Sequence, residues 1–141
     1  MKIIISGATG SLGAFFTRWF SGKGHQVLAI GRTEGPPSQL LACSTYIRAD
    51  ITKPFVLPDA DVCIHCAGLA DDKAKSIDLY AANVEGTKNI IAASRHCKTL
   101  VHISSSSVYS YSDTPLQENM AGENSKNLLS RYGKSKLLAE E

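Results

Sequence analysis

A tyrosine and a lysine near the end of the chain have the spacing of a catalytic pair. Tyr132 and Lys136 are four residues apart, so on a helix they share one face and can converge on one point. A free tyrosine, with a pKa near 10, is a weak base at neutral pH, and a nearby ammonium group favours the phenolate. Tyr132 is therefore a candidate general acid or base, with Lys136 as its partner.

A run of serines supplies further hydroxyl groups. The apolar segment 99–104 reads as a strand and leads directly into Ser104, Ser105, Ser106 and Ser107. Ligands bind at the carboxyl edge of a parallel sheet, where such a strand ends. A serine hydroxyl at this edge can bond a substrate oxygen beside Tyr132.

Three glycines follow the first apolar run at a spacing that suits a phosphate site. Gly7 permits a sharp turn from strand to helix, Gly10 lets a pyrophosphate approach the backbone, and Gly13 allows close packing of helix on strand. The phosphates then meet free N–H groups and the positive end of the helix dipole. The turn predicts dinucleotide binding, and its other expected contact residues are Thr9, Ser11 and Leu12.

The residue after the second strand bears on which dinucleotide is bound. An acidic side chain there would accept hydrogen bonds from a ribose 2'-hydroxyl, but the sequence has Arg32. An arginine can pair with a 2'-phosphate, so the cofactor is expected to be NAD or NADP, with NADP favoured by Arg32.

Apolar runs alternate with segments of helical period along the chain. This order predicts an α/β fold, a Rossmann-type doubly wound parallel sheet with helices on both faces. The expected strands are residues 2–6, 26–30, 45–49, 62–67 and 99–104.

Three helices are expected to position the candidate residues. The first follows the glycine turn and ends at Gly22 and Gly24. The stripe expected to face the sheet is Leu12, Phe15, Phe16, Trp19 and Phe20. The second runs from about 76 to 96, with Ile77, Tyr80, Ala81, Val84, Ile90 and Ile91 expected on its buried side. The third begins near Asn127 and is still running at Glu141, where good helix formers stand without a stop signal.

Composition fits a single domain over residues 1–141. The chain has 43% hydrophobic and 20% charged residues, and its 15 basic and 13 acidic residues are mixed along its length. No basic tract is present that would track a phosphate backbone, so nucleic acid is not an expected partner. The apolar start breaks at Ser6, too early for a signal peptide, and no stretch is long enough to cross a bilayer. We therefore expect a cytoplasmic protein without a membrane partner.

The cysteines do not predict a metal site. Cys63 and Cys66 have the C-x-x-C spacing, but no second pair of Cys or His stands at ligand spacing, and a structural zinc needs four ligands. The pair lies in an apolar run, so core cysteines in a reducing compartment and no bound metal are expected.

Taken together, the motifs resemble those of extended short-chain dehydrogenases, and in particular the NAD-dependent epimerase/dehydratase family. The resemblance covers essentially the whole chain in the right order. Its motifs are the three glycines, Asp50, the turn 65–68, the segment 83–87, the serine run ending in Val108 and Tyr109, and the segment 132–136.

The resemblance implies a role for each matching residue. The catalytic serine falls on Ser105, with Ser106 as the fallback, and Tyr132 and Lys136 carry over as the catalytic pair. Lys136 also holds the nicotinamide ribose, so that it and Tyr132 contact the cofactor. The other implied cofactor residues are Asp50 and Ile51 beside the adenine, Ala67 and Gly68 beside the phosphates and ribose, and Asn83 as a helix residue that supports the site.

Departures from the family pattern affect specificity more than catalysis. Arg32 replaces the acidic residue of NAD-preferring members, and Ser110 stands where a glycine often follows Val-Tyr. The turn 65–68 also matches the small apolar turn that is usual in the family less closely. Members of the family carry a C-terminal portion with the last strands and the sugar-nucleotide pocket, so this chain is expected to be the cofactor-binding part, cut within the Tyr132 helix.

The resemblance implies an epimerase or dehydratase that acts on a nucleotide sugar by transient hydride transfer, with Tyr132 as general acid and base. Two alternatives stay open: an NADPH-dependent carbonyl reductase of the same superfamily, and a dinucleotide-binding module without catalysis. The expected partners are a nucleotide sugar or another small substrate. The resemblance also implies a homodimer formed through the helices of Asn83 and Tyr132.

Overall fold

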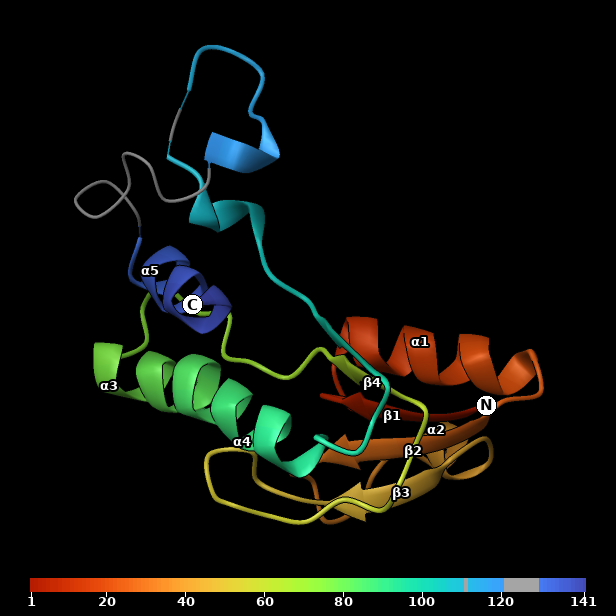
Figure 1. The fold of residues 1–141 in the computed structure, drawn as a ribbon. Coiled ribbons are helices and arrows are strands. Elements are labelled where there is room, and N and C mark those ends of the chain that lie inside the picture. Colours follow the sequence, from red (N-terminus) through yellow and green to blue (C-terminus); the bar gives the residue numbers. More distant parts are fainter. Residues whose placement is uncertain (111, 121–129) are drawn as a thin grey trace.

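Five parallel strands form the centre of the computed structural model, which describes residues 1–110, 112–120 and 130–141 (Figure 1). They are β1 Lys2–Ser6, β2 Gln26–Gly31, β3 Thr45–Arg48, β4 Val62–His65 and β5 Thr99–His102, in the spatial order β3-β2-β1-β4-β5. β1 is central and pairs on both sides, with Ile3 opposite Val27 of β2 and Val62 of β4. The predicted parallel sheet is confirmed, although β3, β4 and β5 end one or two residues before their expected limits.

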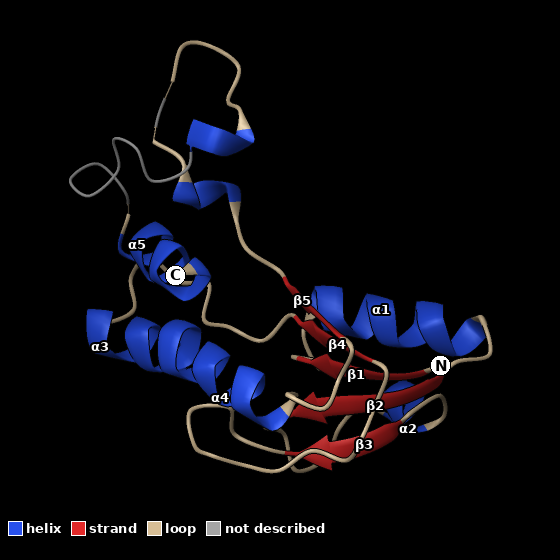
Figure 2. Cartoon of the chain, in the orientation of Figure 1, coloured by secondary structure: helices blue, strands red, loops and turns tan. Residues whose placement is uncertain are grey.

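A loop joins β3 to β4, whereas helices lie between β1 and β2, between β2 and β3, between β4 and β5 and after β5 (Figure 2). They are α1 Ser11–Gly22, α2 Ser38–Leu41, α3 Ser76–Leu79, a π-helical segment Tyr80–Glu85, α4 Gly86–Ala93 and α5 Arg131–Glu140, with 3-10 turns at Ser106–Val108 and Glu118–Met120. The expected start of the last helix near Asn127 lies outside the described residues. The sequence pattern predicts no helix at α2.

Alternate residues of the central strand point to opposite faces of the sheet. Ile3 and Ile5 pack with Phe16 and Phe20 of α1, whereas Ile4 belongs to a second cluster. That second cluster comprises the buried residues Ile4, Leu28, Ile30, Ile51, Leu57, Cys63 and Ile90. Because α1 covers one face and α4 the other, the predicted doubly wound arrangement is confirmed.

The expected inner stripe of α1 is partly wrong. Leu12, Phe15 and Trp19 are 43%, 50% and 53% exposed. The residues buried in this helix are Gly13 and Thr17, and the Thr17 hydroxyl donates to the Gly13 carbonyl over 2.8 Å. Phe16 and Phe20 pack on the sheet as predicted, whereas the small inner residues let the helix approach closely and leave the other three large side chains on its outer side.

The expected inner face of the second helix is also partly wrong. Val84 and Ile90 are buried as predicted, but Ile77, Tyr80 and Ile91 are 73%, 44% and 51% exposed. The buried face also contains Leu79 and two polar residues, Asn83 and Thr87. An apolar pattern cannot locate a face whose buried residues include hydrogen-bonded polar side chains.

The last helix lies beyond the carboxyl ends of the strands (Figure 1). α5 packs against α3, the π-helical segment and the 3-10 turn Ser106–Val108. In the described ranges no helix is both long and apolar enough to span a membrane.

Candidate functional site

The glycine-rich turn between β1 and α1 adopts the backbone form that a phosphate site requires. Gly7 has φ +68, a left-handed conformation that favours glycine. The Gly10 N–H donates to the Gly7 carbonyl and the Ala8 N–H donates to Ile30 of β2, both over 2.9 Å. One bond therefore closes the turn on itself and the other holds it to β2.

The three glycines of this turn face different surroundings. A Cβ at Gly13 would collide with the Gly7 carbonyl, and a Cβ at Gly7 would lie 2.7 Å from the Ala67 nitrogen. A Cβ at Gly10 would meet only the Gly7 oxygen, at 3.3 Å. Gly7 and Gly13 therefore serve packing, while Gly10 borders open space.

The start of α1 offers unshared N–H groups. In the structure as described, no side chain caps this helix and its first turn contains no acidic residue. The first N–H groups of a helix lack internal partners and lie at the positive end of its dipole, so this end favours an anion. Ser11 and Leu12 are exposed in this first turn.

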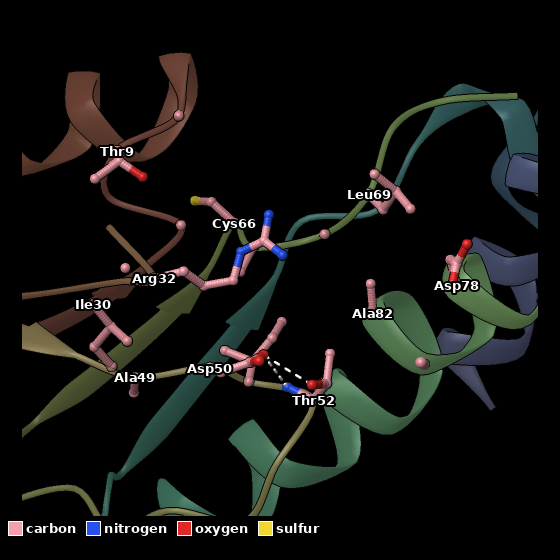
Figure 3. Close-up of a pocket in the computed structure, with 17 residues that line it drawn as sticks. Thr9, Ile30, Arg32, Ala49, Asp50, Thr52, Cys66, Leu69, Asp78 and Ala82 are labelled. Carbon is pink, nitrogen blue, oxygen red and sulfur yellow. Dashed lines mark hydrogen bonds between the residues drawn. The ribbon is translucent and has the colours of Figure 1, made fainter. Parts of the chain in front are cut away.

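A cleft of about 670 Å³ opens at the carboxyl ends of the strands (Figure 3). Its size falls within the range of ligand pockets. The residues expected from the sequence that line it are Gly7, Thr9, Gly10, Arg32, Asp50, Ile51, Ala67 and Gly68. The remaining candidates, Ser11, Leu12, Gly13, Asn83, Ser105, Tyr132 and Lys136, are not among its lining residues.

Arg32 and Asp50 bring opposite charges to one wall of the cleft. Arg32 extends from the end of β2 into the cleft (Figure 3). Asp50 accepts hydrogen bonds from the backbone N–H and the hydroxyl of Thr52, at 3.0 and 2.9 Å. These bonds, and to a lesser extent the charge of Arg32, lower the pKa of Asp50. The wall therefore presents a fixed carboxylate beside an exposed guanidinium.

A buried histidine supports the turn after β4. His65 Nδ1 lies 2.6 Å from the Ser6 hydroxyl, which also accepts from the Ala67 N–H at 3.2 Å. His65 Nε2 lies 3.0 Å from the Thr87 hydroxyl, which donates to the Asn83 carbonyl over 2.5 Å. Ser6 can therefore donate to Nδ1 while Nε2–H donates to Thr87, an arrangement that fits a neutral imidazole. Burial, with smaller contributions from the charges of His102 and Lys136, lowers the pKa of His65 to about 3.

Asn83 joins the turn after β4 to α5. Its side-chain oxygen accepts from the Leu69 N–H at 2.7 Å, and its amide nitrogen donates to the Leu69 carbonyl at 3.0 Å and to the Ser135 hydroxyl at 2.8 Å. Asn83 is 1% exposed, and a Cβ at Gly68 would lie 2.9 Å from its side-chain oxygen. Asn83 thus stands behind the cleft wall and fixes its position.

Two acceptors hold the start of α5. The Ser130 side chain accepts from the Gly133 N–H at 3.0 Å, and Asp72 accepts from the Tyr132 N–H at 3.1 Å. Such caps satisfy helix N–H groups that would otherwise lack partners. Asp72 therefore ties the backbone of Tyr132, whose side chain is half-buried, to the loop that follows β4.

Lys136 is buried and bonded to the end of β5. It is 4% exposed, and its ammonium donates to the Ile103 carbonyl at 2.8 Å and to His102 Nε2 at 3.0 Å. Burial lowers the pKa of Lys136. The sequence predicts the shared helix of Lys136 and Tyr132, and α5 contains both.

The serine run forms the 3-10 turn against which α5 packs. The Ser105 hydroxyl accepts from the Ser107 N–H at 3.1 Å and caps this turn, while Ser106 is exposed. Within the described ranges, no hydrogen bond joins the side chains of Ser105, Tyr132 and Lys136. The fold thus brings their elements together without bonding the three groups to one another.

Cys63 and Cys66 have thiols that stay protonated. Cys63 is in the core, whereas Cys66 lines the cleft. Burial raises the pKa of Cys63 to about 12 and that of Cys66 to about 11. The described part of the chain holds no group of three or more His, Cys, Asp or Glu side chains placed to bind a metal ion.

Several contacts in the site cannot be predicted from sequence motifs. The contacts of Ser6 with His65, Asp72 with Tyr132 and His102 with Lys136 join residues 59, 60 and 34 positions apart. His65 belongs to the motif turn 65–68, and the further local signal is that Ser6, His65 and His102 are polar residues at the ends of apolar strands.

Comparison with known proteins agrees with this geometry. The model of the NAD dependent epimerase/dehydratase family matches residues 3–141. The 2-alkyl-3-oxoalkanoate reductase of Stenotrophomonas maltophilia (strain K279a) is 32% identical over 100% of this chain and 45% of the reductase.

Solved structures show the same fold. A UDP-glucuronic acid 4-epimerase from Bacillus cereus, solved with NAD, is 25% identical with a TM-score of 0.81, covering 99% of this chain and 50% of that protein. A UDP-galactose 4-epimerase is 22% identical with a TM-score of 0.83, covering 99% of this chain and 49% of the other.

The chain thus spans about half the length of these relatives. The family model covers nearly all of it, and the strand order and the glycine turn agree with that match. The chain belongs to the NAD dependent epimerase/dehydratase family.

Proposed function

We propose that residues 1–141 form the cofactor-binding part of an epimerase or dehydratase that oxidises a nucleotide sugar transiently. The observation that carries the proposal is the cleft at the carboxyl edge of the sheet, which is lined by Gly7, Thr9 and Gly10 of the turn and by α3 and the π-helical segment, against which α5 packs. Both parts that such a reaction needs, an anion-binding turn and a helix with a phenol and an ammonium, occur at one edge of one sheet.

The cleft suits a dinucleotide. Free N–H groups at the start of α1 would hold the pyrophosphate, and the open side of Gly10 would let it approach. Asp50 and Ile51 would lie beside the adenine, and Ala67 and Gly68 beside the phosphates and ribose.

Arg32 favours a cofactor with a 2'-phosphate, because its guanidinium lies in the cleft and can pair bidentately with phosphate oxygens. The B. cereus epimerase was solved with NAD. We keep NADP as the favoured ligand on the strength of Arg32 alone, and a titration with both dinucleotides tests that choice.

In the mechanism that we propose, Tyr132 takes the proton from a sugar hydroxyl that Ser105 orients through a hydrogen bond. A bound nicotinamide supplies the hydride acceptor for this step. Lys136 stabilises the phenolate through its positive charge and holds the nicotinamide ribose. Tyr132 then returns the proton when the keto-sugar is reduced, or the keto-sugar loses water in a dehydratase.

The substrate pocket is proposed to lie in a portion beyond residue 141, since the relatives are about twice as long as the stretch they share with this chain. A second candidate function, carbonyl reduction, is favoured by the 32% identity to an oxoalkanoate reductase. The two differ in cofactor balance: a reductase consumes NADPH with a ketone, whereas an epimerase recycles its dinucleotide with a nucleotide sugar.

Cofactor binding is tested with a pair of glycine variants. Gly10→Ala adds a methyl group that the fold tolerates but that projects where the pyrophosphate would lie. Calorimetric titration with NADP and NAD should show affinity lowered at least about tenfold, a cost of about 1.4 kcal/mol. Gly22→Ala, in open space at the far end of α1, is the control and should bind normally. Equal affinity in both variants would remove the turn from the proposal.

Arg32→Asp tests the choice of dinucleotide. It should move the ratio of the two affinities toward NAD, because a carboxylate can accept from the ribose 2'-hydroxyl and repels a 2'-phosphate. An unchanged ratio would leave Arg32 as a solvated surface residue.

Catalysis is tested in the longest form of the protein that turns over. Tyr132→Phe should abolish turnover and keep cofactor affinity, because it removes only the phenol oxygen. Turnover that persists would exclude Tyr132 as the acid and base, and cofactor binding without turnover in the unaltered protein would favour a binding module.

The partner that we propose is a second copy of the chain. Ile77, Tyr80 and Ile91 leave apolar surface exposed along α3, the π-helical segment and α4, and Leu138 does so on α5. Apolar surface at helix faces is typical of a subunit interface. Ile77→Glu should lower the dimer fraction in sedimentation velocity, with the exposed Val56→Glu outside these helices as the control.

A further inference from the structure

The ammonium of Lys136 makes two hydrogen bonds at the end of β5. It donates to the Ile103 carbonyl and to His102 Nε2, at 2.8 and 3.0 Å. A lysine ammonium has three N–H donors. Two bonds to neighbouring residues of one strand end therefore fix the direction of the third donor.

This contact determines the protonation of His102. A nitrogen that accepts from an ammonium carries no proton, so in neutral His102 the proton is on Nδ1. Nδ1 is buried and has no hydrogen-bond partner among the described residues. The neighbouring His65 ring, 5.2 Å away between centroids, has both of its nitrogens bonded to Ser6 and Thr87. The Lys136 contact is thus the polar interaction that His102 makes through its ring.

We propose that His102 is a positioning residue for Lys136: its neutral ring holds the ammonium at the end of β5 with one N–H directed to Tyr132 and the cleft, and protonation of His102 releases the lysine. The role of the third N–H rests on the function proposed above. The hold of His102 on Lys136 is a property of the chain itself.

The charged and titratable groups around His102 set the pH range of this switch. Lys136 and Glu140 face it from α5, and His65 faces it from β4. Burial and the charge of Lys136 lower the pKa of His102, and Glu140 opposes them. His102 is therefore neutral at neutral pH, and its protonation falls on the acid side of its ordinary value of 6.5. Once protonated, it would place two cations at hydrogen-bond distance, and the acceptor would be lost.

The test follows the Lys136 side chain by NMR in the 141-residue chain with ¹³Cε-labelled lysine, without cofactor. Lys136→Arg identifies the signal by its loss. We expect the Lys136 signal to move in an acid step that coincides with the titration of the His102 ring. An unmoved Lys136 signal through that titration would overturn the proposal.

Two substitutions at His102 separate holding from titrating. In His102→Gln the side-chain amide oxygen can stand in place of Nε2, so Lys136 should keep its position while the acid step disappears. In His102→Leu the acceptor is gone, so the Lys136 pKa should fall by about half a unit or more, because the charged form loses a hydrogen bond. His96→Gln, at an exposed histidine, is the control and should leave both behaviours unchanged.

The outcomes also separate this inference from the proposed function. A persistent acid step in His102→Gln, or an unchanged Lys136 pKa in His102→Leu, overturns the role of His102 even if NADP or NAD binds. If neither dinucleotide binds, but the Lys136 signal shows its acid step and its pKa falls in His102→Leu, the proposed function is overturned. The inference that His102 holds Lys136 is then still supported. Should His102→Leu fail to fold, the acid step in the wild type and its loss in His102→Gln still decide the matter.

Discussion

Neutral His65 should make the chain unusually sensitive to acid. Burial, with smaller contributions from the charges of His102 and Lys136, keeps the His65 imidazole neutral in the folded protein and lowers its pKa from 6.5 to about 3. In the unfolded chain the same group titrates near 6.5, so below that pH the unfolded state binds more protons. The free energy of unfolding therefore falls as the pH drops from about 6.5 to about 3, by about 1.4 kcal/mol per pH unit and about 5 kcal/mol in all.

This loss is large compared with the free energy of unfolding of a typical domain, which is about 5 to 15 kcal/mol. We would measure urea denaturation between pH 7 and pH 4 for the wild type, His65→Gln and the exposed control His96→Gln. His65→Gln should be less stable at pH 7. Its free energy of unfolding should nevertheless fall less steeply as the pH drops, because about one proton fewer is taken up on unfolding. His102 contributes in the same direction, so the difference between variants isolates His65. Equal slopes for wild type and His65→Gln, or an NMR titration of the His65 ring near 6.5, would refute the reasoning.

Three further predictions concern stability. Gly13→Ala should cost about 3 kcal/mol because its methyl group meets the Gly7 carbonyl, whereas Gly22→Ala, with nothing nearby, should leave stability unchanged or raise it by up to about 1 kcal/mol in urea denaturation. Asn83→Ala should cost about 2 to 4 kcal/mol, since it leaves buried groups on both sides without partners, and amide hydrogen exchange should rise in α5. Asp72→Ala should cost about 1 kcal/mol and fray the first turn of α5, seen as faster exchange there, and unchanged exchange would remove Asp72 as a cap.

The sheet could be predicted from the sequence because its strands are buried on both faces. Ile3, Ile4 and Ile5 form a continuous apolar run, which is typical of a central parallel strand. The glycine turn was predictable for a related reason: spacing along the chain fixes geometry in a short connection. Helix faces were harder, because Thr17 in α1 and Thr87 in α4 are buried through their own hydrogen bonds, and apolar residues such as Trp19 lie outside.

The contacts between side chains of the candidate site were predictable only where those residues share one element. Tyr132 and Lys136 share a helix, so their relation follows from their spacing. The partner of Lys136 on β5 and the cap that Asp72 gives to α5 depend on how distant segments dock. The sequence also predicts nothing of the π-helical segment that carries Asn83, because its wider turn is set by packing rather than by composition.

The central position of β1 has a consequence for how the chain acquires its structure. β1 is synthesised first, and it can pair on one edge only after β2 has been made. Its other edge pairs with β4, whose residues lie about sixty positions downstream. Such non-local pairing slows folding, because the chain loses entropy in closing the loop before the strand contacts that offset this loss can form. During synthesis one backbone edge of β1 therefore remains unpaired until the fourth strand has left the ribosome, which makes this the interval in which a chaperone would matter most.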